Sequence, residues 1–266
     1  MIQYPNINPT IIKLGPISLR WYGVAYIIGI LGSFKFAESY FKRKLNFTSD
    51  QITNLMLYTI LAIIIGGRLG YILIYDLPYY LQNPKNIFSV WQGGMSFHGG
   101  ALGCFITFII YGLIHQKNVF SMIDILGVGS TIGNILGRLA NFINGELYGR
   151  ITTVPWAMVF PGGGAVGRHP SQLYEAFFEG IVLFAILYLL LKWDKLKPGQ
   201  LFGIYLFLYG LFRFVIEFFR EPDKQMGYLF GWMTAGQLLC LVMVVSGLCL
   251  FFYLQYLSKL TSEEMV

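Results

Sequence analysis

The stretch 137–150 carries the densest polar chemistry of a chain that is otherwise strongly apolar. Just before and within it, Ser130, Asn134, Arg138 and Asn141 recur at i, i+4, i+8 and i+11, the spacing that places side chains on one face of a helix. A guanidinium and two amides that faced acyl chains would cost several kcal/mol. We therefore expect this face to meet protein, water or an anionic ligand.

A second polar strip is expected on another helix, where Tyr209, Arg213 and Glu217 follow one another at four-residue spacing and Arg220 comes shortly after. One interpretation is an arginine and glutamate pair that neutralises itself inside a helix bundle. The other is that Glu217 holds Arg213, which offers its remaining donors to a phosphate, an anion that suits the planar guanidinium. In that case Arg138 would bind the same phosphate from a facing helix.

His98 and Glu146 are further candidates for chemistry. His98 has glycines on both sides and stands near an expected helix start, where the positive end of the helix disfavours imidazolium and keeps the ring able to accept a proton. Its alternative role is that of a hydrogen-bonded anchor at the membrane interface. Glu146 has an equally simple alternative, which is to offset Arg150. Pro170 with Ser171 indicates the start of another helix.

These residues must be positioned by membrane helices. Hydrophobic residues make up 56% of the 266 residues, charged residues 12%, and the mean hydropathy is +0.60. This composition predicts an all-α polytopic membrane protein. About 20 apolar residues span the hydrocarbon core, and about seven segments qualify. They lie at 22–41, 52–75, 95–114, 123–144, 172–191, 201–219 and 236–257.

Basic clusters give the expected orientation. Lys42 to Lys44 follow the first segment, and Lys192, Lys195 and Lys197 follow the fifth, so both loops are expected in the cytoplasm. The N-terminus is then outside and the C-terminus cytoplasmic. With this topology the polar membrane residues share the outer half of the bilayer. They are Tyr22, Arg68, His98, Arg138, Asn141, Arg213 and Glu217. We expect one outward-facing site in one domain, 1–266, with outer loops at about 76–94 and 148–170.

Several functional classes are poorly supported. The net charge of +6 is small and dispersed, which argues against nucleic acid and favours an anionic membrane lipid as partner. The three cysteines lie in apolar runs without metal-ligand spacing. The sequence has no nucleophile elbow, no HExxH and no P-loop. We therefore expect no metal and no cofactor.

The combined motifs resemble those of the bacterial prolipoprotein diacylglyceryl transferases over nearly the whole chain. The residues that carry the resemblance are Trp21 to Gly23, His98 to Gly100, the signature G-R-x-x-N-F-x-N-G-E-x-x-G-R at 137–150, His169 to Glu175, and the strip from Tyr209 to Asp223. Ala140 departs from the family pattern, in which we expect glycine, but the change removes no polar group.

The resemblance implies an enzyme of the bacterial cytoplasmic (inner) membrane whose active site faces the outer leaflet. The expected reaction moves the diacylglyceryl group of phosphatidylglycerol to the lipobox cysteine of a preprolipoprotein signal peptide, forming a thioether and releasing glycerol phosphate. His98, or Tyr209 as a relay, would take the thiol proton, and Arg138 with Arg213 would stabilise the departing phosphate. The expected substrate-binding residues are Tyr22, Arg68, Asn141, Asn144, Glu146, Gly149, Glu217 and Arg220.

Two other functions remain open on the sequence alone. In a transporter or ion pathway, Arg68, Arg138 and Arg213 would line a route through the bilayer. Such a route needs charges at several depths, whereas the inner halves of the segments hold few besides Lys35, Glu38 and Asp124. A non-catalytic scaffold would bind the lipoprotein and leave the phospholipid intact.

Overall fold

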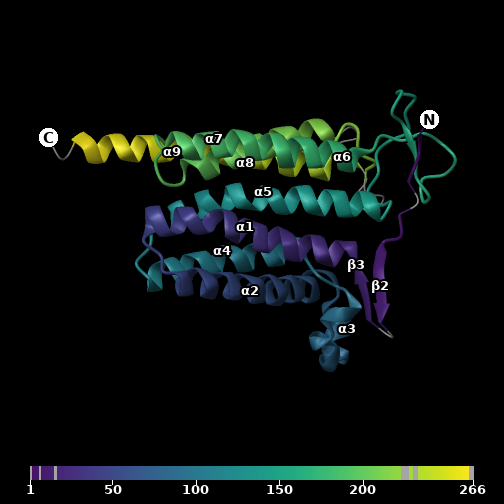
Figure 1. The fold of residues 1–266 in the computed structure, drawn as a ribbon, viewed down its shortest axis with the longest axis horizontal. Helices are drawn as coiled ribbons and strands as arrows, with labels where there is room; N and C mark the ends of the chain where they lie inside the picture. The colour runs from purple at the N-terminus through teal and green to yellow at the C-terminus, as the bar shows by residue number, and fades with distance from the viewer. Residues whose placement is uncertain (1, 6, 15–16, 223–227, 230–232, 264–266) are drawn as a thin grey trace. The chain divides into compact units, whose positions relative to one another are not determined.

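The computed structural model describes residues 2–5, 7–14, 17–222, 228–229 and 233–263. The chain forms two compact units, one of Met1–Ala37 with Asp124–Val266 and one of Glu38–Ile123. Figure 1 shows the elements, and most of the chain is helical. The helices are α1 (Trp21–Leu45), α2 (Ser49–Tyr75), α3 (Leu77–Gln82), η1 (Pro84–Phe88), η2 (Val90–Gln92), α4 (Phe97–Ile114), α5 (Val119–Ile143), α6 (Ser171–Glu175), η3 (Ala176–Val182), α7 (Leu183–Trp193), α8 (Gln200–Ile216) and α9 (Ala235–Glu263).

Within the described residues, five helical segments are long and apolar enough to cross a membrane. They are α2, α4, α5, the continuous run Ser171–Trp193, and Ala235–Leu260 within α9. The apolar helix α8 is shorter. All of these overlap segments expected from the sequence, and the remaining expected segment lies on α1. The prediction of a helical, multi-pass membrane protein is therefore confirmed at this level.

The sixth expected segment is too long at its C-terminal end, because α8 ends at Ile216 rather than Phe219. Beyond it the chain leaves the helix and pairs with the loop that follows α5. The amide of Arg150 donates to the carbonyl of Phe219 at 2.8 Å, and Gly149 bridges to Arg220. A carbonyl that accepts from another segment favours the end of the helix over one more turn.

The described residues also include short strands, which the sequence did not predict. They are β1 (Ile2–Gln3), β2 (Thr10–Leu14), β3 (Ile17–Arg20), β4 (Met158–Val159), β5 (Tyr228–Leu229) and β6 (Met233–Thr234). β1 pairs in parallel with β4, while β2 with β3 and β5 with β6 are antiparallel. The parallel pair ties the N-terminal segment to the loop between α5 and α6.

In the unit that holds α5, three glycines at four-residue spacing, Gly129, Gly133 and Gly137, form a ridge of small residues, and the first two pack against α1. The hydroxyl of Ser33 donates to the carbonyl of Gly129 at 2.8 Å, and a methyl group added at Gly29 would lie 2.9 Å from the Cα of Gly133. Such close backbones need small residues at the crossing. Gly137, the last residue of the ridge, faces open space.

Two caps hold the ends of the helices that carry the polar cluster described below. At the start of α8, Asp124 accepts from the backbone amides of Gly199 and Phe202, both at 2.7 Å. At the end of α5, the Tyr4 hydroxyl lies 2.8 Å from the carbonyl oxygen of Phe142 and 2.7 Å from that of Ile143. Partial burial raises the pKa of Tyr4, which keeps this phenol protonated as a donor. Both helix ends are thereby satisfied by side chains.

The unit Glu38–Ile123 is built on a close pairing of α2 with α4 (Figure 1). A methyl group on Gly66 or Gly99 would collide with the backbone of the other residue, so glycine is required on both sides. The capping box of Thr48 and Gln51 starts α2, and the Ser96 hydroxyl caps α4 by accepting from the Gly99 amide.

Candidate functional site

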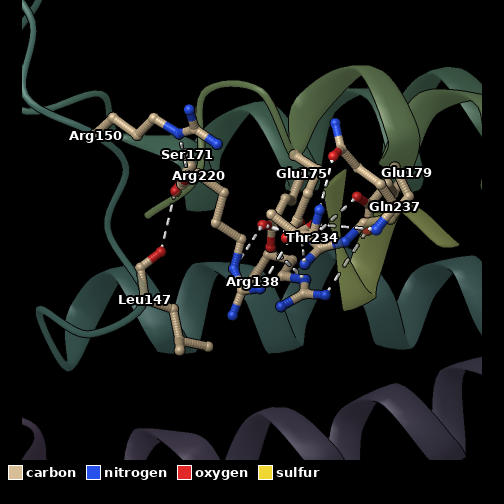
Figure 2. A network of polar contacts seen from close by, with 11 residues as sticks. Arg138, Leu147, Arg150, Ser171, Glu175, Glu179, Arg220, Thr234 and Gln237 are labelled. Carbon is tan, nitrogen blue, oxygen red and sulfur yellow. Dashed lines mark hydrogen bonds and ion pairs between the residues drawn. The ribbon is translucent and has the colours of Figure 1, made fainter. Parts of the chain in front are cut away.

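Arg138 of α5 and Arg213 of α8 meet at one carboxylate, Glu175 of α6. The Nε of Arg138 lies 2.8 Å from Oε2 of Glu175, and the Nη1 of Arg213 lies 2.6 Å from Oε1. Figure 2 shows Glu175 and Glu179 directed toward Arg138 from the neighbouring helix. The predicted convergence of the two guanidinium groups is confirmed, but a protein carboxylate already lies between them.

Glu179 contacts the same two arginines at longer range. Its Oε1 lies 3.5 Å from Nη1 of Arg213, and its Oε2 lies 3.8 Å from Nη2 of Arg138. These are ion pairs beyond the 2.7–2.9 Å of a strong charge-assisted hydrogen bond. The two arginines are therefore held tightly by one glutamate and loosely by the next.

Glu217, the residue directly after α8, holds Arg213 from one turn further along the chain, as the spacing predicted. Its Oε2 lies 3.1 Å from Nη2 of Arg213 and 3.7 Å from Nη1 of Arg220, while its Oε1 accepts from the hydroxyl of Thr234 at 3.1 Å. Thr234 and Gln237 also form a reciprocal cap at the start of α9. The start of α9 therefore supplies a neutral donor to the cluster.

The arginines and glutamates of the cluster differ in exposure as well as in charge. Arg138, Arg213 and Arg220 face the carboxylates of Glu175, Glu179 and Glu217, so the formal charges balance. The arginine side chains keep 23%, 12% and 10% of their surface exposed, while the glutamates keep 0%, 0% and 3%. An anion that approaches this cluster therefore meets guanidinium groups first, with the carboxylates behind them.

The backbone that presents the two glutamates is irregular. Residues Ala176–Val182 form a π-helical segment between α6 and α7, a geometry often associated with functional sites. Gly180 within it lies against Ile135 of α5, where any methyl group would collide with the Ile135 side chain. This small residue lets the glutamate helix approach the helix of Arg138.

Beyond the end of α5, two amides converge on one carboxylate. The Nδ2 atoms of Asn141 and Asn144 donate to Oε1 of Glu146 at 2.9 and 3.0 Å, and the side chain of Gln172 donates to the Glu146 carbonyl at 2.6 Å. Glu146 itself is exposed. Arg150 directs its Nε to the carbonyl of Arg220 at 2.9 Å. The structure therefore gives Glu146 amide partners and gives Arg150 a backbone carbonyl as partner.

Gly149 is a point of close backbone approach rather than a source of polar groups. Its amide donates to the carbonyl of His169 at 2.8 Å, and a methyl group added there would collide with the carbonyl of Phe219 and with the backbone and Cβ of His169. Only glycine allows these strands of the loop to lie together. This contact joins the signature stretch to the end of α8.

The protein-family model of the prolipoprotein diacylglyceryl transferases matches residues 9–253. The chain belongs to this family. Among curated proteins it is 48% identical over 253 residues to the phosphatidylglycerol–prolipoprotein diacylglyceryl transferase of Oleidesulfovibrio alaskensis, with 94% of each chain covered. It is 46% identical to the proteins of the same name from Pseudomonas paraeruginosa and Pseudoalteromonas translucida, with 94–95% coverage.

Four other residues were expected to act in catalysis or substrate binding, and the structure places them as follows. Tyr22 is exposed on the first turn of α1, with its hydroxyl 3.2 Å from that of Tyr26. Tyr209 is partly covered one turn before Arg213, and its ring stacks on Tyr205 at 5.9 Å. His98 is exposed on the first turn of α4 and belongs, with Arg68, to the unit Glu38–Ile123. Their roles in this member of the family stay predictions.

The two most buried acids of the cluster were missed as site residues. From the sequence, Glu175 was expected only as part of a motif that leads into a helix, and no role was expected for Glu179. A signal was present, because two glutamates four residues apart in an apolar segment are costly and mark a site by default. The T-x-x-Q pattern at Thr234 to Gln237 was likewise a readable cap.

Proposed function

We propose that this chain transfers the diacylglyceryl group of phosphatidylglycerol to the lipobox cysteine of preprolipoproteins. Membership of the transferase family supports the reaction, and the arginine pair of Arg138 and Arg213 on the exposed side of the glutamate cluster carries the assignment of the site. A lipid phosphodiester is the anion that these donors would bind. The curated relatives are named as transferases, which favours this function over a transporter.

The chemistry is a displacement at a glycerol carbon. The cysteine sulfur forms a bond to that carbon, the carbon–oxygen bond to phosphate breaks, and glycerol phosphate leaves with the bonding electrons. Charge grows on the leaving phosphate, so fixed guanidinium donors stabilise the transition state more than the ground state. Arg138 and Arg213 supply these donors, and Glu217 and Arg220 complete the charged wall of the site.

The remaining residues orient the substrates and handle the proton. Tyr22, Asn141, Asn144 and Glu146 orient the glycerol headgroup, and Gly149 keeps their loop closed against α8. His98 takes the thiol proton, or Tyr209 relays it, since the thiolate is the nucleophile. Arg68 contributes indirectly, through the loop before α4 that it holds.

The whole chain, 1–266, acts as a single membrane domain in this proposal. It crosses the bacterial cytoplasmic membrane with seven helices, the N-terminus outside and the C-terminus in the cytoplasm. The loops 76–94 and 148–170 then lie on the outer side, and the active site faces the outer leaflet. The basic residues after α1 and α7 support this orientation.

A direct assay tests the reaction. Purified protein is mixed with phosphatidylglycerol and a lipobox peptide, and the peptide is analysed by mass spectrometry for a thioether-linked diacylglyceryl group. We expect product with the wild-type protein and at least a hundredfold loss with Arg138→Ala, about the effect of removing one essential oxyanion donor. Full activity of Arg138→Ala would refute the proposed phosphate contact. Lipid-independent counterflow in proteoliposomes without any product would favour the transporter.

A further inference from the structure

Glu175 and Glu179 are chemically identical, fully covered, and close to the same two guanidinium groups. Their contacts nevertheless differ by about an ångström at each arginine, 2.8 against 3.8 Å at Arg138 and 2.6 against 3.5 Å at Arg213. Two buried acids with the same partners and unequal contacts need not have the same role. The difference separates a permanent partner from an exchangeable one.

Glu175 uses one oxygen for each arginine. Oε2 faces Nε of Arg138 and Oε1 faces Nη1 of Arg213, so the carboxylate fixes the separation of two groups that come from different helices. The contact to Arg138 uses Nε and leaves its Nη groups for other partners. A rigid spacer of this kind preorganises both arginines toward one anion.

Glu179 approaches terminal guanidinium nitrogens, Nη2 of Arg138 and Nη1 of Arg213. Its Oε2 lies 3.8 Å from Nη2 of Arg138 and, like Oε2 of Glu175, accepts no hydrogen bond from any described residue, so distance is what separates the two glutamates at Arg138. A buried carboxylate oxygen left without a hydrogen bond is costly. The Nη2 group that it approaches is therefore weakly occupied and available to a stronger acceptor such as a phosphate oxygen.

We propose that Glu175 is the positioning residue that holds Arg138 and Arg213 for the lipid phosphate, and that Glu179 is the counter-ion which this phosphate replaces at the two guanidinium groups. The inference rests on the proposed transferase function and deepens it. It assigns opposite effects to the same substitution at two neighbouring positions. A purely structural cluster would respond to both substitutions in the same way.

The test compares Glu175→Gln with Glu179→Gln, which make the same change in size and charge. Initial rates are measured with phosphatidylglycerol in mixed micelles and a lipobox peptide, together with inhibition by glycerol 1-phosphate. For Glu175→Gln we expect kcat to fall about a hundredfold, because misplaced donors cost transition-state stabilisation. For Glu179→Gln we expect the KM for phosphatidylglycerol and the inhibition constant of glycerol phosphate to fall at least threefold, because the competing anion is gone.

The control is Glu38→Gln, at a partly exposed glutamate paired with Lys42 outside the cluster, which should change neither constant by more than twofold. Equal loss of kcat in both cluster variants, or weaker phosphate binding in Glu179→Gln, would overturn the inference. If Glu175→Gln does not fold, Glu175→Asp keeps the charge and shortens the arm. A wild-type kcat in that variant would equally overturn it. Absence of product from the wild-type protein would instead refute the transferase function itself.

Discussion

Arg68 and the pair Arg138 with Arg213 are arginines on membrane helices with very different partners. In the unit Glu38–Ile123, Arg68 is buried and directs its N–H groups to backbone carbonyls of the segment that precedes α4. Nε donates to Ile87, Nη1 to Gly93 and Gly94, and Nη2 to Asn86 and Ser89. Arg138 and Arg213, in the other unit, face carboxylates.

The difference teaches which buried arginines can serve a ligand. The five N–H groups of a guanidinium are all used at Arg68, and their acceptors belong to the backbone of one loop. Replacing those acceptors would require the loop to unfold. At Arg138 and Arg213 the partners are side-chain anions, and another anion of similar geometry can take the place of one of them. A buried arginine bound to backbone carbonyls, such as Arg68, therefore has a structural role. Buried arginines bound to carboxylates, such as Arg138 and Arg213, can exchange a partner for a ligand anion.

Replacing each kind of arginine by lysine should give the largest contrast. For Arg213→Lys we expect kcat/KM to fall about a hundredfold with a change of only a few degrees in the unfolding midpoint, because lysine keeps the charge but loses the planar fork. For Arg68→Lys we expect the midpoint to fall by about 5 °C or more, since several hydrogen bonds to a charged donor are lost, and activity to fall less than tenfold.

Thermal unfolding in detergent and the thioether assay measure the two quantities on the same preparations. The comparison fails if Arg68→Lys loses activity a hundredfold while its unfolding midpoint is unchanged. That result would make Arg68 a direct ligand of the substrate, as the family resemblance suggested.

A smaller effect is expected from the carbonyl side of the Arg68 contacts. Gly93 and Gly94 both have positive φ angles, of 89° and 74°, so alanine is strained at either position. A methyl group on Gly94 would also lie 2.8 Å from Nη1 of Arg68, whereas one on Gly93 would face open space. Gly94→Ala should therefore lower the unfolding midpoint several degrees more than Gly93→Ala. Equal midpoints would show that the loop absorbs the contact with Arg68.

The smallest expected effect concerns pH and the loop that leads into α6. Partial burial lowers the pKa of His169, whose ring contacts Phe219 and whose Nδ1 lies 3.1 Å from the Tyr174 hydroxyl. The unfolded chain therefore binds a proton more readily than the folded chain. The stability contributed by the neutral ring is present above about pH 6.5 and is lost as the pH falls toward the lowered pKa.

We expect the unfolding midpoint to fall slightly from pH 7.5 to pH 5.5, and to fall less in His169→Gln. An identical pH response of both proteins would remove His169 as its cause.

Part of this arrangement could be predicted from the sequence because the place of a residue along a helix, and the face it shares with others, follow from counting residues. The four-residue spacing correctly predicted that Tyr209 and Arg213 follow each other by one turn of α8 and that Glu217, just after its end, contacts Arg213. The positions of Arg138 and Asn141 near the end of α5 also followed from helical periodicity. Family motifs supplied the reaction, since spacing alone names no substrate.

What the sequence could not provide was the identity of each partner across space. Both Arg68 and Arg138 were expected to contact substrate, yet one meets loop carbonyls and the other a glutamate. Every residue has a backbone carbonyl, so residue types do not show which carbonyls accept hydrogen bonds from a side chain such as Arg68. Glu179 was missed although its spacing from Glu175 was visible, because the sequence does not show that both carboxylates face the same two arginines.

The irregular turn at Ala176–Val182 has a consequence for how the protein tolerates changes in length. A π-helical turn accommodates one residue more than an ordinary turn. Deleting a single apolar residue there, such as Phe177, would allow a regular helix to form without shortening the span appreciably. Glu175, upstream of the deletion, would keep about the same angular setting relative to α7, because the wide turn absorbs the residue that the deletion removes. Deleting a residue from the regular helix α7 would instead rotate everything upstream by about 100°. The charged cluster should thus tolerate the loss of one residue in this turn better than the loss of one residue in the regular turns of α7.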